Sequence, residues 1–202
     1  VQEKLKKHYE LDVPKTAIYT AAMATADYLR QEGITKSLYV IGEAGLLQYL
    51  QARGFDVCCK TPEAVVVGLD RHVTYEKLTD ATQAILAGAR LIGTNADRLI
   101  PTEHGLCPGG GSLAKLLAYA TRQPVQFIGK PEAYMYQQAL QLLQTSPEKT
   151  LMIGDNYLTD IQGAMRVGMD TALVYTGFTR PEEILDPAPT YTCHTLADLC
   201  CL

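Results

Sequence analysis

A short apolar run that ends in Gly and then Asp constrains the fold of this chain more than any other feature of its sequence. The run stops at Gly154 and Asp155 follows directly, which is typical of a buried strand bounded by glycine. Thr159 is predicted to cap the next helix, and Gln162 would complete a capping box. The pattern therefore places Asp155 at the carboxyl end of a strand and Asp160 at the start of the following helix.

These two acids predict a metal site. In an open parallel α/β sheet, ligands bind outside the carboxyl ends of the strands. Two carboxylates about 4 Å apart, at an effective dielectric of about 20, repel each other by roughly 4 kcal/mol, so a proton or a cation must relieve the repulsion. Taken alone, each acid is more often a loop residue or a helix-start residue. The spacing of the pair favours a Mg²⁺ site formed by Asp155 and Asp160.

The composition argues against several classes of protein. The chain has 202 residues, of which 47% are hydrophobic and 20% are charged, as in an ordinary globular protein with a sizeable core. A net charge of −4 argues against a nucleic-acid-binding protein, which usually has a basic face. There is no run of about 18 apolar residues that would indicate a membrane span, and the charged first residues do not resemble a signal peptide. The six cysteines show no zinc-binding spacing, so we expect reduced thiols in a cytoplasmic protein.

Predicted strands alternate with predicted helices along the chain. Strands are expected at 38–41, 64–69, 90–94, 124–129, 150–154 and 171–175, and helices at 1–11, 21–30, 43–53, 74–87, 112–119, 131–144 and 161–168. The segment 95–111 is rich in Gly and Pro and is predicted to be a loop. Thr74 is predicted to cap the helix that runs to about Ala87. Pro131 is predicted to lie in the first turn of its helix, whose core stripe is expected to be Tyr136, Ala139, Leu140 and Leu143. The alternation indicates βαβ units, and hence an α/β fold with mainly parallel sheets.

Lys130 is a second candidate site residue. It follows a predicted strand and Gly129, and it precedes a helix whose N-terminus favours anions. A lone Lys after a strand is usually solvated, but this one comes one βα unit before the acid pair. A cation beside metal-bound carboxylates suits a phosphate during transfer. The glycine run 109–111 matches no phosphate-binding loop and is predicted to be a flexible turn. No strand is followed by Gly-x-Gly-x-x-Gly, which disfavours a dinucleotide-dependent oxidoreductase.

The segments Gly129–Glu132 and Gly154–Asp160 together resemble the third and fourth motifs of the haloacid dehalogenase (HAD) superfamily of phosphatases. The segments Thr20–Ala26 and Gly93–Asp97 are similar to those of its NagD-like, nitrophenylphosphatase-like branch. This resemblance covers essentially the whole chain. It implies a Rossmann-like HAD core with a parallel sheet, incomplete at its N-terminus, and a large inserted α/β cap. The cap is expected at residues 31–123, and the partial core at 1–30 and 124–202.

The resemblance also implies roles for individual residues. Asp155 resembles the Mg²⁺ ligand of the fourth motif, and Asp160 resembles the second acid, which supports the metal. Lys130 resembles the catalytic Lys that steadies the phosphoryl group and the nucleophile. Substrate contacts are expected from Lys130 and from three polar residues, Asn95, Asp97 and Asn156. A homodimer formed through the cap is expected by the same resemblance.

One departure from the family pattern concerns the nucleophile. Family members begin with a strand that ends in Asp-x-Asp, whose first Asp attacks phosphorus, and no two aspartates of this chain are separated by a single residue. We therefore expect a Mg²⁺-dependent phosphatase of small phosphomonoesters such as sugar phosphates, nucleotides or aryl phosphates, with its nucleophilic Asp upstream of Val1. The 202-residue chain alone is expected to show no turnover. The alternative is a truncated, inactive HAD remnant that acts at most as a binding module.

Overall fold

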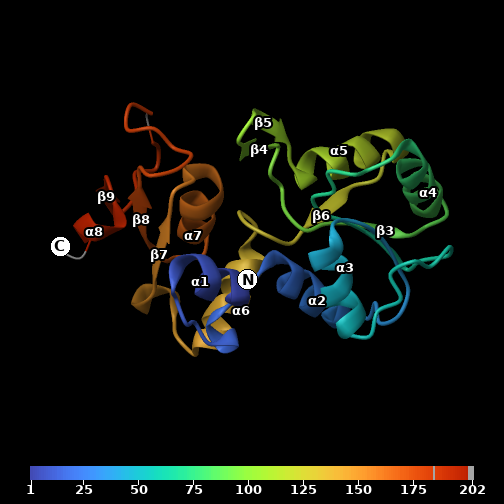
Figure 1. Cartoon of the computed structure of the whole chain (residues 1–202), viewed down its shortest axis with the longest axis horizontal. Helices are drawn as coiled ribbons and strands as arrows, with labels where there is room; N and C mark the ends of the chain where they lie inside the picture. The colour runs from blue at the N-terminus through green and yellow to red at the C-terminus, as the bar shows by residue number, and fades with distance from the viewer. Residues whose placement is uncertain (184, 200–202) are drawn as a thin grey trace.

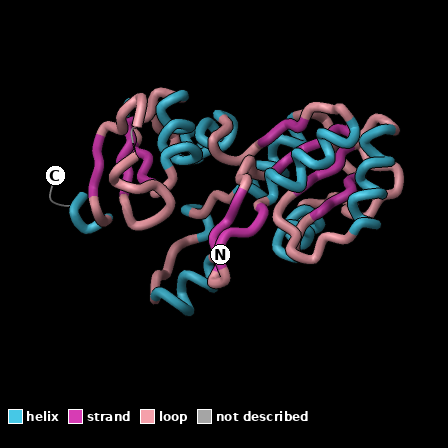
Figure 2. Tube along the Cα trace, turned by 90° about the horizontal axis from the view of Figure 1, so that it is seen from above, coloured by secondary structure: helices cyan, strands magenta, loops and turns pink. Residues whose placement is uncertain are grey.

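The fold consists of two lobes that lie side by side (Figures 1 and 2). The structure, a computed structural model, describes residues 1–183 and 185–199. The larger lobe has a parallel sheet in the order β1-β2-β3-β6, formed by β1 (Leu38–Ile41), β2 (Ala64–Val67), β3 (Arg90–Gly93) and β6 (Val125–Phe127). The smaller lobe has a parallel sheet in the order β7-β8-β9, formed by β7 (Leu151–Gly154), β8 (Asp170–Val174) and β9 (Tyr191–Cys193). The predicted α/β class with parallel sheets is therefore confirmed.

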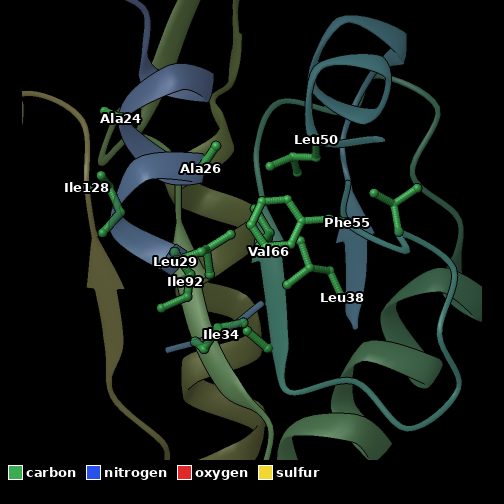
Figure 3. Close-up of a cluster of buried hydrophobic side chains, with 12 residues drawn as sticks. Ala24, Ala26, Leu29, Ile34, Leu38, Leu50, Phe55, Val66, Ile92 and Ile128 are labelled. Atoms are coloured by element: carbon green, nitrogen blue, oxygen red, sulfur yellow. The ribbon is translucent and has the colours of Figure 1, made fainter. Parts of the chain in front are cut away.

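Helices cover both faces of the larger sheet. One face carries α2 (Ala21–Gln31) and α3 (Ala44–Ala52), and the other carries α4 (Tyr75–Leu86) and α5 (Gly110–Thr121). Figure 3 shows the first of these layers, where side chains of α2 and α3 meet those of the sheet. The strand β2 supplies both layers, because Val66 packs on the first face and Val65 on the second. All of β2 is buried, as expected for an inner strand of a parallel sheet with helices on both sides.

The strand β7 differs in burial from the prediction. It forms where expected, but Leu151 and Ile153 are 39% and 41% exposed. Within the described part of the chain, β7 pairs with β8 alone and is an edge of its sheet. An edge strand that lacks a second neighbour leaves part of its side chains in solvent, so the prediction of a buried strand is wrong.

The predicted capping box after β7 is also wrong. Asn156, not Thr159, caps the turn, because its Oδ1 accepts hydrogen bonds from the backbone N–H groups of Leu158 and Thr159 at 3.1 and 3.3 Å. The turn is a π-helix, η3 (Tyr157–Ile161), and α7 (Gln162–Arg166) begins only after it. Asn is as good an N-cap as Thr, and sequence alone does not decide between two such residues three positions apart.

The helix after β6 begins later than predicted. This helix, α6 (Ala133–Leu143), has Glu132 as its N-cap residue, so Pro131 precedes the helix rather than lying in its first turn. Leu143 was expected in the core stripe of this helix but is 65% exposed, because it lies in the last turn, beyond the packed part of the helix.

The segment 95–111 contains a hairpin where a loop was predicted. The strands β4 (Leu99–Thr102) and β5 (Gly105–Pro108) pair antiparallel, and Thr102 Oγ1 donates to the carbonyl of Gly105 at 2.6 Å across the turn. In Figure 1 the hairpin lies on the side of the larger lobe that faces the smaller lobe. Its strands are short and contain prolines, so their composition is that of a loop. The remaining elements are α1 (Gln2–Tyr9), η1 (Lys15–Ala17), η2 (Pro147–Lys149) and α8 (Leu196–Leu199). Both α8 and β9 lie after the last predicted strand, in a part of the chain for which no element was predicted.

Three further predictions concern the whole chain. Among the residues that the structure describes, no helix is both long enough and apolar enough to cross a membrane. The described cysteines are all free thiols, whereas Cys200 and Cys201 lie outside the described residues. The division into a cap at 31–123 and a core at 1–30 and 124–202 stays a prediction. Two elements of the larger lobe lie mainly outside that cap range: α2 packs on the sheet, and β6 pairs with β3.

Candidate active site

The two motif segments meet where the lobes join. Lys130 lies in the segment that leaves β6 of the larger lobe and enters α6, and this segment runs between the lobes in Figure 1. Gly129 anchors it, because its N–H donates to the carbonyl of Thr94, just after β3, at 2.8 Å. Asp155 and Asp160 follow β7 of the smaller lobe. Carboxyl ends of strands from both sheets therefore contribute to one site.

Lys130 and Asp160 form a direct ion pair. Lys130 Nζ donates to Asp160 Oδ1 at 2.5 Å, and the side chains of Lys130 and Asp160 are 35% and 6% exposed. The second oxygen, Oδ2, accepts a hydrogen bond from the backbone N–H of Asn156 at 3.1 Å. Both carboxylate oxygens of this buried acid are thus engaged, which is the condition under which a buried charge is tolerated. The pair fixes the direction of the Lys130 ammonium group.

Gly154 permits the close approach on which this arrangement depends. A Cβ at position 154 would lie 2.3 Å from Cβ of Asp160 and 2.6 Å from its Oδ2. The end of β7 therefore has room for the Asp160 side chain only because Gly154 has none. The Gly that marks the strand end in the sequence serves the packing of the acid against that strand.

Asp155 is held by the turn that follows β8. Its Oδ2 accepts a hydrogen bond from the N–H of Phe178 at 3.1 Å, and its carbonyl accepts one from the N–H of Thr179 at 3.0 Å. Gly177 lies so close that a Cβ there would be 1.7 Å from Asp155 Oδ2. Thr179 is buried and its Oγ1 accepts a hydrogen bond from the N–H of Tyr157 at 2.8 Å. The turn 177–179 thus orients Asp155 and supports η3.

The donor set at Asp155 fits a Mg²⁺ ion, which prefers carboxylate oxygens. Oδ1 of Asp155 accepts no hydrogen bond from any residue that the structure describes, so this oxygen is open. Asp160 differs, because Lys130 and Asn156 already contact its two oxygens. Within residues 1–183 and 185–199, no group of three or more His, Cys, Asp or Glu side chains could hold a metal by itself. Asp155 is therefore the acid of this pair with an open oxygen, and the metal-ligand roles of Asp155 and Asp160 both stay predictions.

Asn95 and Asp97 reach the same site from the larger lobe. The Asn95 side chain packs against Gly129, where an added Cβ would lie 3.1 Å from Asn95 Nδ2. Burial raises the pKa of Asp97, the positive charge of Lys130 opposes this, and the negative charge of Asp160 adds to it. Asp97 therefore lies within electrostatic range of the ion pair. The substrate contacts expected of Asn95 and Asp97 stay predictions, but Asn95 lies against Gly129 and Asp97 is within electrostatic range of Lys130.

The glycine run 109–111 is not the flexible turn that was predicted. Gly110 and Gly111 begin α5, and the N–H of Gly111 donates to the carbonyl of Asp97 at 3.0 Å. A Cβ at Gly111 would lie 2.4 Å from the carbonyl carbon of Ala96. The glycines are needed for contact between two backbone segments, and this contact holds Asp97 in place.

Replacing Asp97 with asparagine should raise the thermal stability of the chain at neutral pH by a few degrees. A raised pKa in the folded state means that the ionised carboxylate is less favourable there than in the unfolded chain. The stability gained by the asparagine variant is therefore present above the folded-state pKa of Asp97. It disappears as the pH falls through that pKa towards the ordinary pKa of Asp. Melting curves of both proteins across this range measure the effect. A stability difference that does not depend on pH would contradict it.

Asn156 and two contacts that sequence reasoning missed complete the site. Asn156 is adjacent to Asp155, but its Oδ1 caps η3, so the substrate contact expected of it stays a prediction. The turn containing Gly177 was overlooked, although a Gly shortly after a predicted strand could have drawn attention to it. Tyr136 was assigned only to the core stripe of its helix, yet its hydroxyl contacts the backbone of η3.

Comparison with known proteins identifies the family. A profile of the HAD-hydrolase-like family matches residues 127–199. The 5'-nucleotidase YutF of Bacillus subtilis is 43% identical over 196 residues, covering 95% of this chain and 77% of the relative. An acid sugar phosphatase of Staphylococcus haemolyticus is 40% identical over 195 residues, covering 95% of this chain and 74% of the relative.

Solved structures agree with these sequence matches. The p-nitrophenyl phosphatase of Archaeoglobus fulgidus is 32% identical, with a TM-score of 0.89 over 98% of this chain and 78% of the other. NagD of E. coli K-12 is 29% identical, with a TM-score of 0.85 over 98% of this chain and 78% of the other. These relatives identify the chain as a hydrolase of the phosphatase class. Within that class, the chain belongs to the HAD superfamily, in its NagD-like branch. The predicted family, fold class and enzyme class are confirmed.

Proposed function

We propose that this chain supplies Lys130 and Asp155 to the active site of a Mg²⁺-dependent phosphatase that acts on small phosphomonoesters. The observation that carries the proposal is the Lys130–Asp160 ion pair at the junction of the lobes. Asp155, whose Oδ1 is open, lies five residues before Asp160 in the same segment. An ammonium group of fixed direction beside a carboxylate that can bind a hard cation suits the charge of a phosphoryl group during transfer.

Each of these residues has a separate task in the proposed reaction. Asp155 would hold Mg²⁺ through Oδ1, and the bound ion supplies positive charge next to the phosphoryl oxygens. Asp160 directs the Lys130 ammonium group at the phosphoryl group through their ion pair. Asn95 and Asp97 line the side of the site that belongs to the larger lobe, where they would contact the substrate. An aspartate attacks phosphorus, the leaving alcohol takes a proton from a second acid, and water hydrolyses the aspartyl-phosphate to release phosphate.

The nucleophile of this reaction is not among the 202 residues, because the sequence contains no Asp-x-Asp. In the proposal it comes from residues upstream of Val1. The single-sided pairing of β7 and the exposure of Leu151 and Ile153 support this, since a further segment could pack there. The alternative, a truncated remnant without catalytic activity, would retain Asp155 as a weak cation-binding residue at most.

The substrate panel that tests the proposal follows from the relatives. The protein, expressed with the in-frame residues that precede Val1, should hydrolyse at least one of p-nitrophenyl phosphate, nucleoside monophosphates and sugar phosphates when Mg²⁺ is present. Removal of the metal with a chelator should stop the reaction, because the phosphoryl charge is then no longer neutralised. The 202-residue chain alone should show no turnover. Released phosphate is the measurement.

Two outcomes would contradict parts of this proposal. Robust hydrolysis by the 202-residue chain would remove the need for an upstream nucleophile. The absence of hydrolysis by the extended protein on every substrate would favour the inactive remnant.

The expected cytoplasmic location and the homodimer through the cap stay predictions. Two exposed apolar side chains on one outer helix of the larger lobe, Leu116 and Tyr119 of α5, support such a dimer.

A further inference from the structure

We infer that Tyr136 is a positioning residue whose hydroxyl holds the π-helix η3 so that Asp160 faces Lys130. The inference rests on the proposed function insofar as it concerns catalysis. Tyr136 belongs to α6, the helix that begins after Lys130, and Asp160 belongs to η3 of the smaller lobe. Tyr136 therefore provides a second contact between the segment that carries Lys130 and the segment that carries Asp160, apart from the ion pair itself.

The contacts of the Tyr136 hydroxyl are specific. The side chain is buried, and the hydroxyl donates to the carbonyl of Thr159 and lies 3.1 Å from the carbonyl oxygen of Asp160. A phenol has one proton to donate, so the two carbonyls share it. Two consecutive carbonyls directed at one donor fix the orientation of the peptide that joins Thr159 to Asp160. The direction of the Asp160 side chain follows from that orientation.

The π-helical geometry makes this support necessary. The N–H groups of Asp160 and Ile161 both point to the carbonyl of Asn156, at 2.8 and 3.4 Å. A single π-turn is a rare conformation that is frequently found at functional sites. Here it turns Asp160 back towards Gly154, so that its oxygens reach Lys130 and the N–H of Asn156. An ordinary α-helical turn would direct the carboxylate elsewhere.

A glycine on the neighbouring helix makes room for the hydroxyl. A Cβ at Gly163 of α7 would lie 2.4 Å from the Tyr136 hydroxyl oxygen and 2.7 Å from its ring. The helices α6 and α7 therefore approach closely enough for the Tyr136 hydroxyl to reach η3 only because position 163 has no side chain. This arrangement exceeds what core packing requires, since a Phe at this position of α6 would fill the same space.

Tyr134 provides a matched control on the same helix. Its hydroxyl oxygen is buried and has no hydrogen-bond partner among the described residues, and its ring packs edge-on against Tyr28 at a centroid distance of 5.3 Å. Tyr134→Phe and Tyr136→Phe each remove one hydroxyl oxygen from a side chain of α6. Only the second variant removes a contact to η3.

The test has a kinetic arm and a structural arm. In the extended, active protein, Tyr136→Phe should lower kcat about tenfold and leave KM within about twofold, because a displaced catalytic group slows the chemical step more than it weakens binding. In the 202-residue chain, the amide protons of Asp160 and Ile161 should exchange about five- to tenfold faster, as expected for the loss of one hydrogen bond. Tyr134→Phe should change neither quantity, and Gly163→Ala should reproduce both effects by displacing the Tyr136 ring.

Each result decides the inference. A Tyr136→Phe protein with the kcat of Tyr134→Phe would reduce Tyr136 to a packing residue, even if amide exchange were faster. Unchanged amide exchange would overturn the inference outright. If the unmodified extended protein has no activity, the proposed function fails, and the exchange arm alone then decides whether Tyr136 holds η3.

Discussion

Replacing Asp155 with asparagine should lower kcat/KM for phosphomonoester hydrolysis in the extended protein by about a thousandfold. The N–H of Phe178 donates to Oδ2 of Asp155 at 3.1 Å, so in the variant the amide oxygen must face Phe178. The amide NH₂ group then takes the position of the open Oδ1. A neutral donor replaces a charged acceptor where Mg²⁺ would bind, while the shape of the side chain is retained.

Two measurements separate this effect from a loss of folding. The melting temperature of Asp155→Asn should change by a few degrees at most, and calorimetric titration should no longer detect Mg²⁺ binding. Asp170→Asn is the matched control, because Asp170 begins β8 in the same lobe and has an exposed side chain. That control should retain full activity. Retained Mg²⁺-dependent hydrolysis by Asp155→Asn would reject the metal assignment.

The elements that position the site are readable from the sequence because each one follows a local rule. The apolar run before Asp155 and the run before Lys130 end in glycine, and both form strands at the expected positions. Thr74 was predicted to cap a helix, and its side chain accepts a hydrogen bond from the N–H of Lys77 at the start of α4. Periodicity and capping act within a few residues, so these predictions did not depend on tertiary contacts. The capping box after β7 was wrong because two nearby residues could each cap the turn.

The relations between elements are not readable in this way. β6 and β7 are successive strands of the chain, yet they belong to different sheets, so Lys130 and Asp160 meet across the two lobes. The metal shared by the two acids stays a prediction. The sequence did not show that Asp160, rather than Asp155, would pair with Lys130. Spacing along the chain shows which residues lie at strand ends. It does not show which partner a carboxylate finds there, because that depends on η3 and on contacts such as those of Gly177.

Tyr136 illustrates a second kind of limit. Its position in the apolar stripe of α6 was predicted correctly, and it is buried. Periodicity predicts that the ring is buried but gives no information about the hydroxyl. The partners of the hydroxyl come from a segment more than twenty positions away in sequence. A hydroxyl on a residue of an apolar stripe is thus the only sequence signal of such a contact. A tyrosine hydroxyl alone is no such signal, since Tyr134 of the same helix has a buried hydroxyl with no partner among the described residues.

Lys130→Met should have the second large effect, and it should act on activity and stability together. The loss of the ammonium group should lower kcat by about a thousandfold, because the developing charge on the phosphoryl group is no longer compensated. It also leaves the carboxylate of Asp160, whose side chain is only 6% exposed, without its counter-ion. We expect the free energy of unfolding to fall by about 2 kcal/mol, which is below the usual loss for a buried pair. The loss is smaller because Lys130 is 35% exposed and water can partly replace it.

The double variant Lys130→Met, Asp160→Asn separates the two consequences. The asparagine side chain would be neutral and could still accept the hydrogen bond from the N–H of Asn156, so most of the lost stability should return. Activity should not return, because the ammonium group is still missing. Denaturant unfolding and single-turnover hydrolysis measure the two quantities. If the double variant were as unstable as Lys130→Met, the destabilisation would not arise from an unpaired charge. If it regained activity, Lys130 would serve only to neutralise Asp160, and its assignment to the phosphoryl group would be wrong.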